Sequence, residues 1–232
     1  VQVVVAFRML PKVVWQMPRK GTFNLHASLL PDYRGAAPIN WAIINGETTT
    51  GVTTFLIDEQ IDTGAILLRK EVAIAPRETA GTLHDKLMAV GADSVVETLA
   101  LMASDKAVPQ PQPKQVVEKA APKIHKETSH IPWEQPLAHI DRFVRGMAPY
   151  PTAWAQLHHE GEVYAVKIYE ATPQEATHTL PIGSVRVQDR YIEVAVQGGF
   201  LRVESLQFPS KKRMSAREFL NGFHFVEGDF FA

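Results

Sequence analysis

The sequence predicts two structural units, an α/β unit followed by a small open antiparallel β-barrel. Val1–Phe7 is a nearly continuous β-branched run, as in a parallel strand covered on both faces. VPQPQPKQ, at residues 108–115, has prolines at alternate positions and predicts an extended, semi-rigid linker. Many short strands with regular turn signals follow it, the pattern of a small barrel. We therefore expect units at 1–105 and 115–232, joined by a linker at 106–114.

The first unit shows a succession of short elements. Residues 11–18, bounded by two prolines, predict a short helix or turn, and residues 21–26 predict a strand. Pro38 is suited to a first helical turn, and Gly46 to the end of that helix. Residues 51–74 predict two strands joined by a loop that carries Asp58, Glu59 and Asp62. From Thr79 the apolar spacing predicts a long helix that ends near Asp105.

The second unit begins with a helix in WEQPLAHIDRFVRGM, where apolar residues recur on one face. A hairpin is predicted to turn at Glu160-Gly161, and three further strands to turn at Asp189-Arg190 and Gly198-Gly199. A final short helix begins at a capping box formed by Ser215 and Glu218 and ends by Gly222.

Composition narrows the function only slightly. The 232 residues carry 24 Lys and Arg against 25 Asp and Glu, so bulk charge gives no sign of a nucleic-acid or membrane partner. There are no cysteines, which excludes disulfides and thiolate metal sites and is compatible with a cytoplasmic protein. No apolar run is long enough to span a bilayer, and the histidines show no metal-ligand spacing, so we expect no metal. VQVVVAF has no Met and no signal pattern, so we expect a fragment of a longer protein.

The most informative stretch is NLHASLLPDYRGAAPINWAI, residues 24–43. Residues two apart on a strand share a face, so Asn24, His26 and Ser28 are predicted to point one way. In isolation, an N-x-H pattern is more often a pair of satisfied polar groups on a half-exposed edge. Here the other face is too apolar for a free edge, and a loop whose Gly35 permits close backbone approach follows directly. The polar face therefore predicts a functional site.

Asp62, in IDEQIDTG, is the third candidate. By pattern alone it is a turn residue, because Asp-Thr-Gly favours turns. Its combination with Asn24 and His26 favours a functional role.

These blocks, with the later GVTTFLIDEQIDTGAIL, resemble the 10-formyltetrahydrofolate-dependent formyltransferases. APKIHKETSHIPWEQPLAHIDRFVRGMAPYPTAW and SKKRMSAREFLNG resemble the C-terminal domain of the members that act on methionyl-tRNA. The resemblance runs through both units. It implies a Rossmann-like first unit and an OB-like second unit. It also implies that the first strand–helix units of the sheet, with a loop for recognition of the tRNA acceptor end, are missing here.

The resemblance implies formyl transfer from 10-formyltetrahydrofolate to the amino group of methionyl initiator tRNA, a step of translation initiation. Negative charge develops on the formyl oxygen in the tetrahedral transition state, and Asn24 and His26 would donate hydrogen bonds to it. Asp62 would orient His26, favour its imidazolium and accept the proton that the amine loses. The substrate amine is the nucleophile, so no nucleophilic side chain is needed.

The folate slot is carried over from the same resemblance. Arg8, Met9 and Leu10 end the first strand and match the segment that lines the pterin slot. Ser28, Leu29, Leu30 and Pro31 would border the folate. For Met9 or Leu10 alone, ordinary core packing remains the alternative.

The nucleic-acid interface is predicted at Lys211, Lys212 and Arg213, just before the last helix. A run of three basic residues is usually a solvated face, but the resemblance favours tRNA contact, with lysines 114, 119, 123 and 126 as a second spaced set. We expect a monomer when the protein is complete. The alternatives are a sugar-nucleotide amine formyltransferase, a related formyltetrahydrofolate hydrolase domain, or an inactive tRNA-binding fragment.

Overall fold

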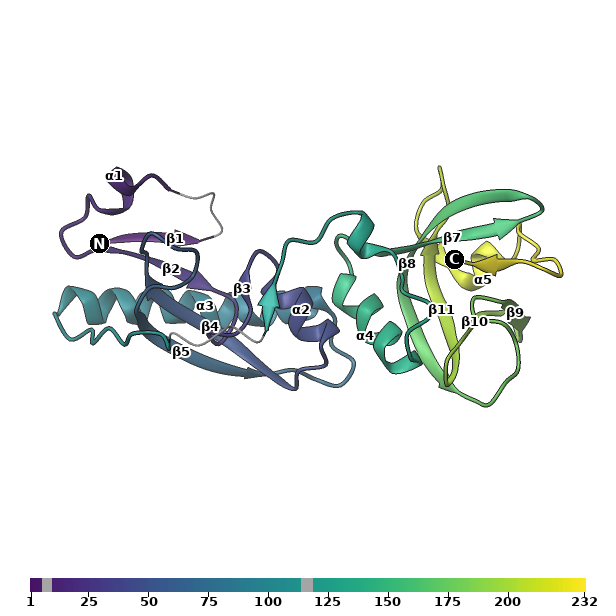
Figure 1. The fold of residues 1–232 in the computed structure, drawn as a ribbon, viewed down its shortest axis with the longest axis horizontal. Helices are drawn as coiled ribbons and strands as arrows, with labels where there is room; N and C mark the ends of the chain where they lie inside the picture. The colour runs from purple at the N-terminus through teal and green to yellow at the C-terminus, as the bar shows by residue number, and fades with distance from the viewer. Residues whose placement is uncertain (6–9, 114–118) are drawn as a thin grey trace. The chain divides into compact units, whose positions relative to one another are not determined.

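A computed structural model describes residues 1–5, 10–113 and 119–232 (Figure 1). Two compact units are found within it. The first comprises Val1–Ala42, Glu47–Glu78 and Thr82–Lys123, and the second comprises Ile43–Gly46, Thr79–Gly81 and Ile124–Ala232. Each unit is described by itself below.

Within the described residues, the first unit is built on a four-stranded sheet in the order β1-β2-β4-β5. These strands are β1 (Gln2–Val5), β2 (Thr22–His26), β4 (Thr49–Leu56) and β5 (Ile66–Ala73). β1 and β2 are parallel, whereas β4 is antiparallel to both of its neighbours. β2 therefore lies inside the sheet, which confirms that its polar face does not belong to a free edge.

The burial expected for the first strand is not observed. Val5 is 55% exposed and Val4 is the only buried residue of β1. The reason is that, within the described residues, β1 has a sheet neighbour on one side only, β2.

The helices of this unit are α1 (Lys12–Trp15), α2 (Pro38–Ile44) and α3 (Ala80–Ala103). α2 begins at Pro38 as predicted and is followed by Gly46 at φ +76°. α3 packs closely on the sheet, because a Cβ added at Gly91 would lie 2.8 Å from Leu25 on β2. Thr98 on the same helix is hydrogen-bonded at 2.8 Å to Thr54 on β4. Within the described residues, no helix is both long and apolar enough to cross a membrane.

The proline-rich segment belongs to the first unit. Gln110 exchanges two backbone hydrogen bonds of 2.8 Å with Ile66, at the start of β5. Further on, β6 (Ala120–Ala121) runs parallel to β3 (Arg34–Gly35). The contacts therefore divide the chain after Lys123, beyond the 106–114 segment that the sequence predicts as the linker, because these backbone pairs hold the segment on the sheet.

The second unit is a curved antiparallel sheet in the order β13-β7-β8-β11-β10-β9, with β12 paired to β11 (Figure 1). Its strands are β7 (Ala153–His159), β8 (Glu162–Glu175), β9 (Val185–Gln188), β10 (Tyr191–Val196), β11 (Gly199–Gln207), β12 (Met214–Ser215) and β13 (Phe230–Phe231). Register shifts interrupt the pairing of β8 with β11 near Ser205, and such irregularities increase strand curvature.

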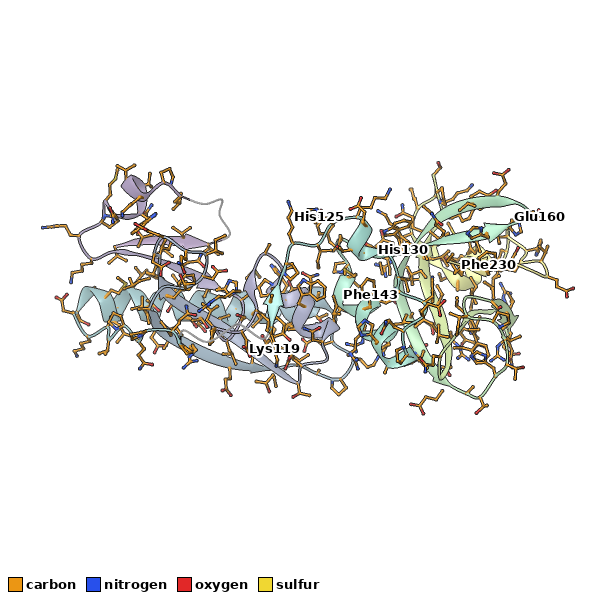
Figure 2. The ribbon with its side chains drawn as sticks, viewed as in Figure 1. Lys119, His125, His130, Phe143, Glu160 and Phe230 are labelled. Atoms are coloured by element: carbon orange, nitrogen blue, oxygen red, sulfur yellow. The ribbon has the colours of Figure 1, made fainter. Side chains whose placement is uncertain are left out.

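The predicted turns of this unit are confirmed. Glu160 lies at the tip of the β7–β8 hairpin (Figure 2), and it and Gly161 have φ of +48° and +85°. Asp189 and Arg190, between β9 and β10, also have positive φ. Two consecutive residues of positive φ match the right-handed twist of a hairpin.

Three helical elements complete the unit: a 3₁₀ turn (Glu127–Ser129), α4 (Leu137–Met147) and α5 (Ala216–Phe219). α4 buries the face predicted from its spacing, including Leu137, Ile140, Val144 and Met147. The predicted capping box at the start of α5 is present, since Ser215 and Glu218 bond each other's backbone N–H groups. Hydrogen bonds from the backbone N–H of Ser215, and to a lesser extent from its side chain, hold the pKa of the Glu218 carboxyl below its usual value.

Candidate functional site

A cavity of about 1340 Å³ opens in the first unit, above the carboxyl ends of β1 and β2. Its walls are mostly apolar side chains from the sheet and from α3, among them Val5, Leu25, Val52, Phe55, Leu87 and Met88. Asn24, His26 and Asp62 supply polar groups to the same lining. Mostly apolar walls with a few convergent polar groups are typical of a small-molecule site.

Asn24 lies on β2 and is only 4% exposed. Its Nδ2 donates a hydrogen bond of 2.8 Å to the carbonyl oxygen of Val4 on the neighbouring β1. A side-chain amide has two N–H donors. Since Val4 takes one of them, the amide is fixed in orientation, and within the described residues no second partner for it is found, so the other donor is available to a ligand in the cavity.

His26, two residues further along β2, is 7% exposed and its tautomer follows from its contacts. Nε2 lies 2.8 Å from the carbonyl oxygen of Tyr33, which can only accept, so Nε2 must carry a proton. Nδ1 faces Asp62, with 3.8 Å between Nδ1 and Oδ2. His26 can therefore donate a hydrogen bond from Nδ1 only in its doubly protonated form. The ring also meets Phe55 edge-on, at 6.5 Å between centroids.

The position of the Asp62 carboxylate is set by one hydrogen bond and by an unusual backbone conformation. Its Oδ2 accepts a hydrogen bond of 3.0 Å from the backbone N–H of Gly35. Its backbone has φ of +56°, a left-handed conformation that is uncommon for residues other than glycine but is tolerated by Asp and Asn. The carboxylate thus reaches His26 because the loop turns sharply at Asp62.

Two glycines make this arrangement sterically feasible. A Cβ at Gly64 would lie 1.6 Å from the carbonyl oxygen of Leu56, and one at Gly35 would lie 2.4 Å from that of Ala121. Gly35 also has φ of +124°. The I-D-T-G and R-G signals of the sequence therefore correspond to close backbone approaches on either side of Asp62.

The residues predicted to bind folate are not all brought to the cavity. Leu10 lines it, whereas Ser28, Leu29, Leu30 and Pro31, all within the described residues, are not part of the lining. Ser28 is fully buried, and its hydroxyl donates to the carbonyl of Asp32 at 2.6 Å. Leu30 packs in a core cluster with Phe55 and Ile66. Arg8 and Met9 lie outside the described residues.

Several residues that line the cavity were not predicted as site residues from the sequence. Asn40 and Gln60 contribute polar groups, and Trp15 contributes an aromatic one. Lys12 and Glu59 line the cavity too and form an ion pair, and hydrogen bonding to Lys12 lowers the pKa of Glu59. Of these residues, Glu59 alone had a signal in the sequence, because it lies with Asp58 and Asp62 in one acidic loop.

The three residues of the predicted basic cluster in the second unit are exposed, but they differ in whether a carboxylate compensates their charge. Arg213 is ion-paired with Glu170, donates from Nε to Ser205 at 2.8 Å and lies over the ring of Tyr169. Lys211 and Lys212 are exposed and make no ion pair with any residue that the structure describes. Of the second lysine set, Lys119 pairs with Glu47 at 2.7 Å, Lys126 lies over Trp154, and Lys114 lies outside the described residues.

The described ranges contain no group of three or more His, Asp or Glu side chains arranged to hold a metal ion. Asn24 and His26 instead offer hydrogen-bond donors beside the carboxylate of Asp62. This arrangement can stabilise a developing oxyanion and accept a proton without a covalent intermediate on the protein.

Comparison with known proteins gives consistent matches in both units. Residues 1–99 match the family model for formyl transferase, and residues 123–224 match that for the formyl transferase C-terminal domain. The methionyl-tRNA formyltransferase of Parabacteroides distasonis is 55% identical over 228 residues, which cover 96% of this chain and 70% of that protein. That of Flavobacterium johnsoniae is 51% identical over 226 residues, covering 97% of this chain and 72% of that protein.

Among solved structures, HypX from Aquifex aeolicus in complex with tetrahydrofolic acid superposes with a TM-score of 0.71. Its sequence identity is 20%, and the match covers all of this chain and 42% of that one. This likeness confirms the predicted fold, a Rossmann-like α/β unit followed by an OB-like β-barrel unit.

Proposed function

Because this chain belongs to the formyl transferase family, with relatives of 51–55% identity that are methionyl-tRNA formyltransferases, we propose that it formylates methionyl initiator tRNA. The formyl donor in this proposal is 10-formyltetrahydrofolate. The observation that carries it is the convergence of Asn24, His26 and Asp62 on one apolar-walled cavity.

The cavity suits the two reactants in size and character. Cavities for single drug-sized ligands measure about 300–1,000 Å³, so about 1340 Å³ leaves space for a folate and for an aminoacyl group beside it. Leu10, which lines the same cavity, would close one side of the slot for a flat heteroaromatic ring. The polar groups lie together on β2 and its neighbouring loop, where the formyl group would be placed.

The reaction exchanges one C–N bond for another. The amine of the methionyl group attacks the formyl carbon, and negative charge develops on the formyl oxygen. The second N–H of Asn24 and a protonated Nδ1 of His26 would donate to that oxygen. Because the bond to Tyr33 fixes Nε2–H, a proton on Nδ1 points toward Asp62 and the cavity.

Asp62 would serve the same step in two ways. Its carboxylate, 3.8 Å from Nδ1, stabilises the positive charge of the imidazolium. It would also accept, through a water molecule, the proton that the attacking amine loses. The C–N bond to the folate nitrogen then breaks, and that nitrogen takes up a proton as it leaves.

We propose that Lys211 and Lys212 contact the tRNA phosphates, because both are exposed and uncompensated by a carboxylate within the described residues. Arg213, paired with Glu170, is a weaker candidate. We also propose that the protein is cytoplasmic, because charged tRNA is found in that compartment, and that it is a monomer.

The experiment is a transfer assay with 10-formyltetrahydrofolate and two competing acceptors, methionyl initiator tRNA and an amino-sugar nucleotide. Formyl-methionyl-tRNA as the main product supports the proposal. Transfer to the sugar alone, or hydrolysis of the folate with neither acceptor formylated, contradicts it.

A further inference from the structure

Gln112, in the proline-rich segment, makes side-chain contacts that an extended, semi-rigid linker would not require. Its Nε2 donates to the carbonyl oxygens of Asp62, at 3.0 Å, and of Gly64, at 2.8 Å. Its Oε1 accepts a hydrogen bond of 2.6 Å from Nη2 of Arg34. Both donors of the amide and its acceptor are thus engaged in the half-buried contact.

The orientation of this amide is determined by its partners. If the amide were flipped, its oxygen would face two carbonyl oxygens and its NH₂ group would face a guanidinium. Both contacts would be repulsive, so only the orientation with Nε2 toward the Asp62 loop satisfies every group. The side chain therefore recognises this loop specifically.

The contact lies at the point where the loop carries its unusual geometry. Asp62 has φ of +56°, and two residues later Gly64 passes so close to Leu56 that no Cβ would fit. A left-handed conformation at a non-glycine residue persists only where its surroundings hold it. Gln112 binds the carbonyls on both sides of this turn.

Arg34 connects the same amide to the other support of Asp62. Its neighbour Gly35 gives the backbone N–H that Oδ2 of Asp62 accepts. Arg34 Nε is buried and has no hydrogen-bond partner within the described ranges, so Oε1 of Gln112 is an acceptor that this guanidinium needs. The side chain of Gln112 is therefore hydrogen-bonded both to the loop that carries Asp62 and to Arg34 of β3, whose neighbour Gly35 binds the Asp62 carboxylate.

We propose that Gln112 is a positioning residue for formyl transfer, which holds the Asp62 carboxylate at its place beside His26. This inference rests on the function proposed above. It gives the proline-rich segment a part in the reaction, although no atom of Gln112 lines the cavity.

The decisive variant is Gln112→Glu, because it keeps the size of the side chain and its partner Arg34. It replaces both N–H donors by a carboxylate oxygen that faces two carbonyl oxygens. Displacement of catalytic groups by about 1 Å costs up to about 100-fold in rate, so we expect kcat to fall about 10- to 100-fold. Michaelis constants for both substrates should change little, since the apolar walls of the cavity are untouched.

Gln110→Glu is the matched control. Gln110 lies two residues earlier in the same segment, has an exposed side chain and contacts Ile66 through its backbone only. Its substitution adds the same charge and should leave kcat and the melting temperature close to wild type. If Gln112→Glu does not fold, Gln112→Ala gives the same comparison with Gln110→Ala.

The coupling to Asp62 distinguishes positioning from general stabilisation. In an Asp62→Asn background, the Gln112 substitution should cause little further loss of kcat, because the group it positions is already disabled. An equal fold-loss in both backgrounds, or an unchanged kcat in Gln112→Glu, would overturn the proposal.

A readout without catalysis keeps this proposal separate from the proposed function. Hydrogen exchange at the Gly35 amide, which Asp62 accepts, should be faster in Gln112→Glu than in Gln110→Glu. Unchanged exchange would refute positioning even if the protein formylates tRNA. A wild-type protein that formylates no tRNA would refute the proposed function, whatever the exchange shows.

Discussion

Asn24→Ala should separate two functions that one amide performs. One N–H of Asn24 binds the carbonyl of Val4 and joins β2 to β1. The second N–H is the proposed donor to the formyl oxygen. Truncation to alanine removes both, and each loss has its own measurable consequence.

The expected magnitudes differ enough to be told apart. Loss of the bond to Val4 should lower the free energy of unfolding by about 1 kcal/mol, the usual net value of one hydrogen bond. Loss of an oxyanion donor costs about 2.7–4 kcal/mol in transition-state stabilisation, which corresponds to a fall of about 10²- to 10³-fold in kcat. Folate affinity should change much less, because the charge on the oxygen develops only in the transition state.

The assay is single-turnover transfer from 10-formyltetrahydrofolate to methionyl-tRNA, with urea unfolding in parallel. Thr22→Val is the matched control. Thr22 lies two residues earlier on the same strand, is buried and is not itself part of the cavity lining. Its hydroxyl contacts the backbone oxygen of Trp15 at 2.7 Å and Oε1 of Gln2 at 3.0 Å. It should lose similar stability and keep its kcat. A folded Asn24→Ala protein within about tenfold of the wild-type kcat would refute the oxyanion role.

Three further outcomes are expected. Replacing Lys211 and Lys212 together by Ala should reduce the salt slope of tRNA binding by about 0.7–0.9 per phosphate contact and leave folate binding unchanged, as filter binding at several salt concentrations would show. Gly64→Ala should lower the melting temperature and abolish transfer, since its Cβ would meet Leu56 O at 1.6 Å, whereas Gly222→Ala, with nothing within 4 Å, should do neither. Burial raises the pKa of Glu193, but Arg202 and Arg186 outweigh it and hold that pKa below the ordinary 4.5. Its stabilising contribution is therefore present above pH 4.5 and lost as pH falls further, and Glu193→Gln should flatten this part of the pH dependence in urea unfolding.

Local signals in the sequence were sufficient for much of the fold. The sequence of residues 21–26 predicted a strand, and β2 spans Thr22–His26. Glu160-Gly161 predicted a hairpin turn because few residues accept positive φ, and both residues have it. Each of these features depends on the properties of a few adjacent residues, and neighbours distant in sequence do not change them.

What the sequence did not predict depends on contacts between distant residues. Gln112 sits between prolines that favour an extended linker, yet its amide binds carbonyls some 50 residues earlier. Arg213 belongs to a basic run, yet its charge is compensated by Glu170 on β8, which pairs with β11. Ser28 continues the polar alternation of β2 in the sequence, but the strand ends at His26. The hydroxyl of Ser28 instead donates a hydrogen bond to the backbone carbonyl of Asp32. No local pattern contains this information.

The charge distribution of the second unit bears on how a polyanion could bind to a protein of net charge −1. The buried carboxylate of Glu193 is already shared by two arginines, and Glu170 is paired with Arg213. A phosphate would have to compete with these carboxylates, so such arginines add less to affinity than their number suggests. Lys211 and Lys212 have no such competitor within the described residues, and a lysine in water releases a counterion from the nucleic acid when it binds. A small number of uncompensated lysines would then provide weak, salt-sensitive attraction for tRNA, while selection of the acceptor group would be left to the cavity around Asn24.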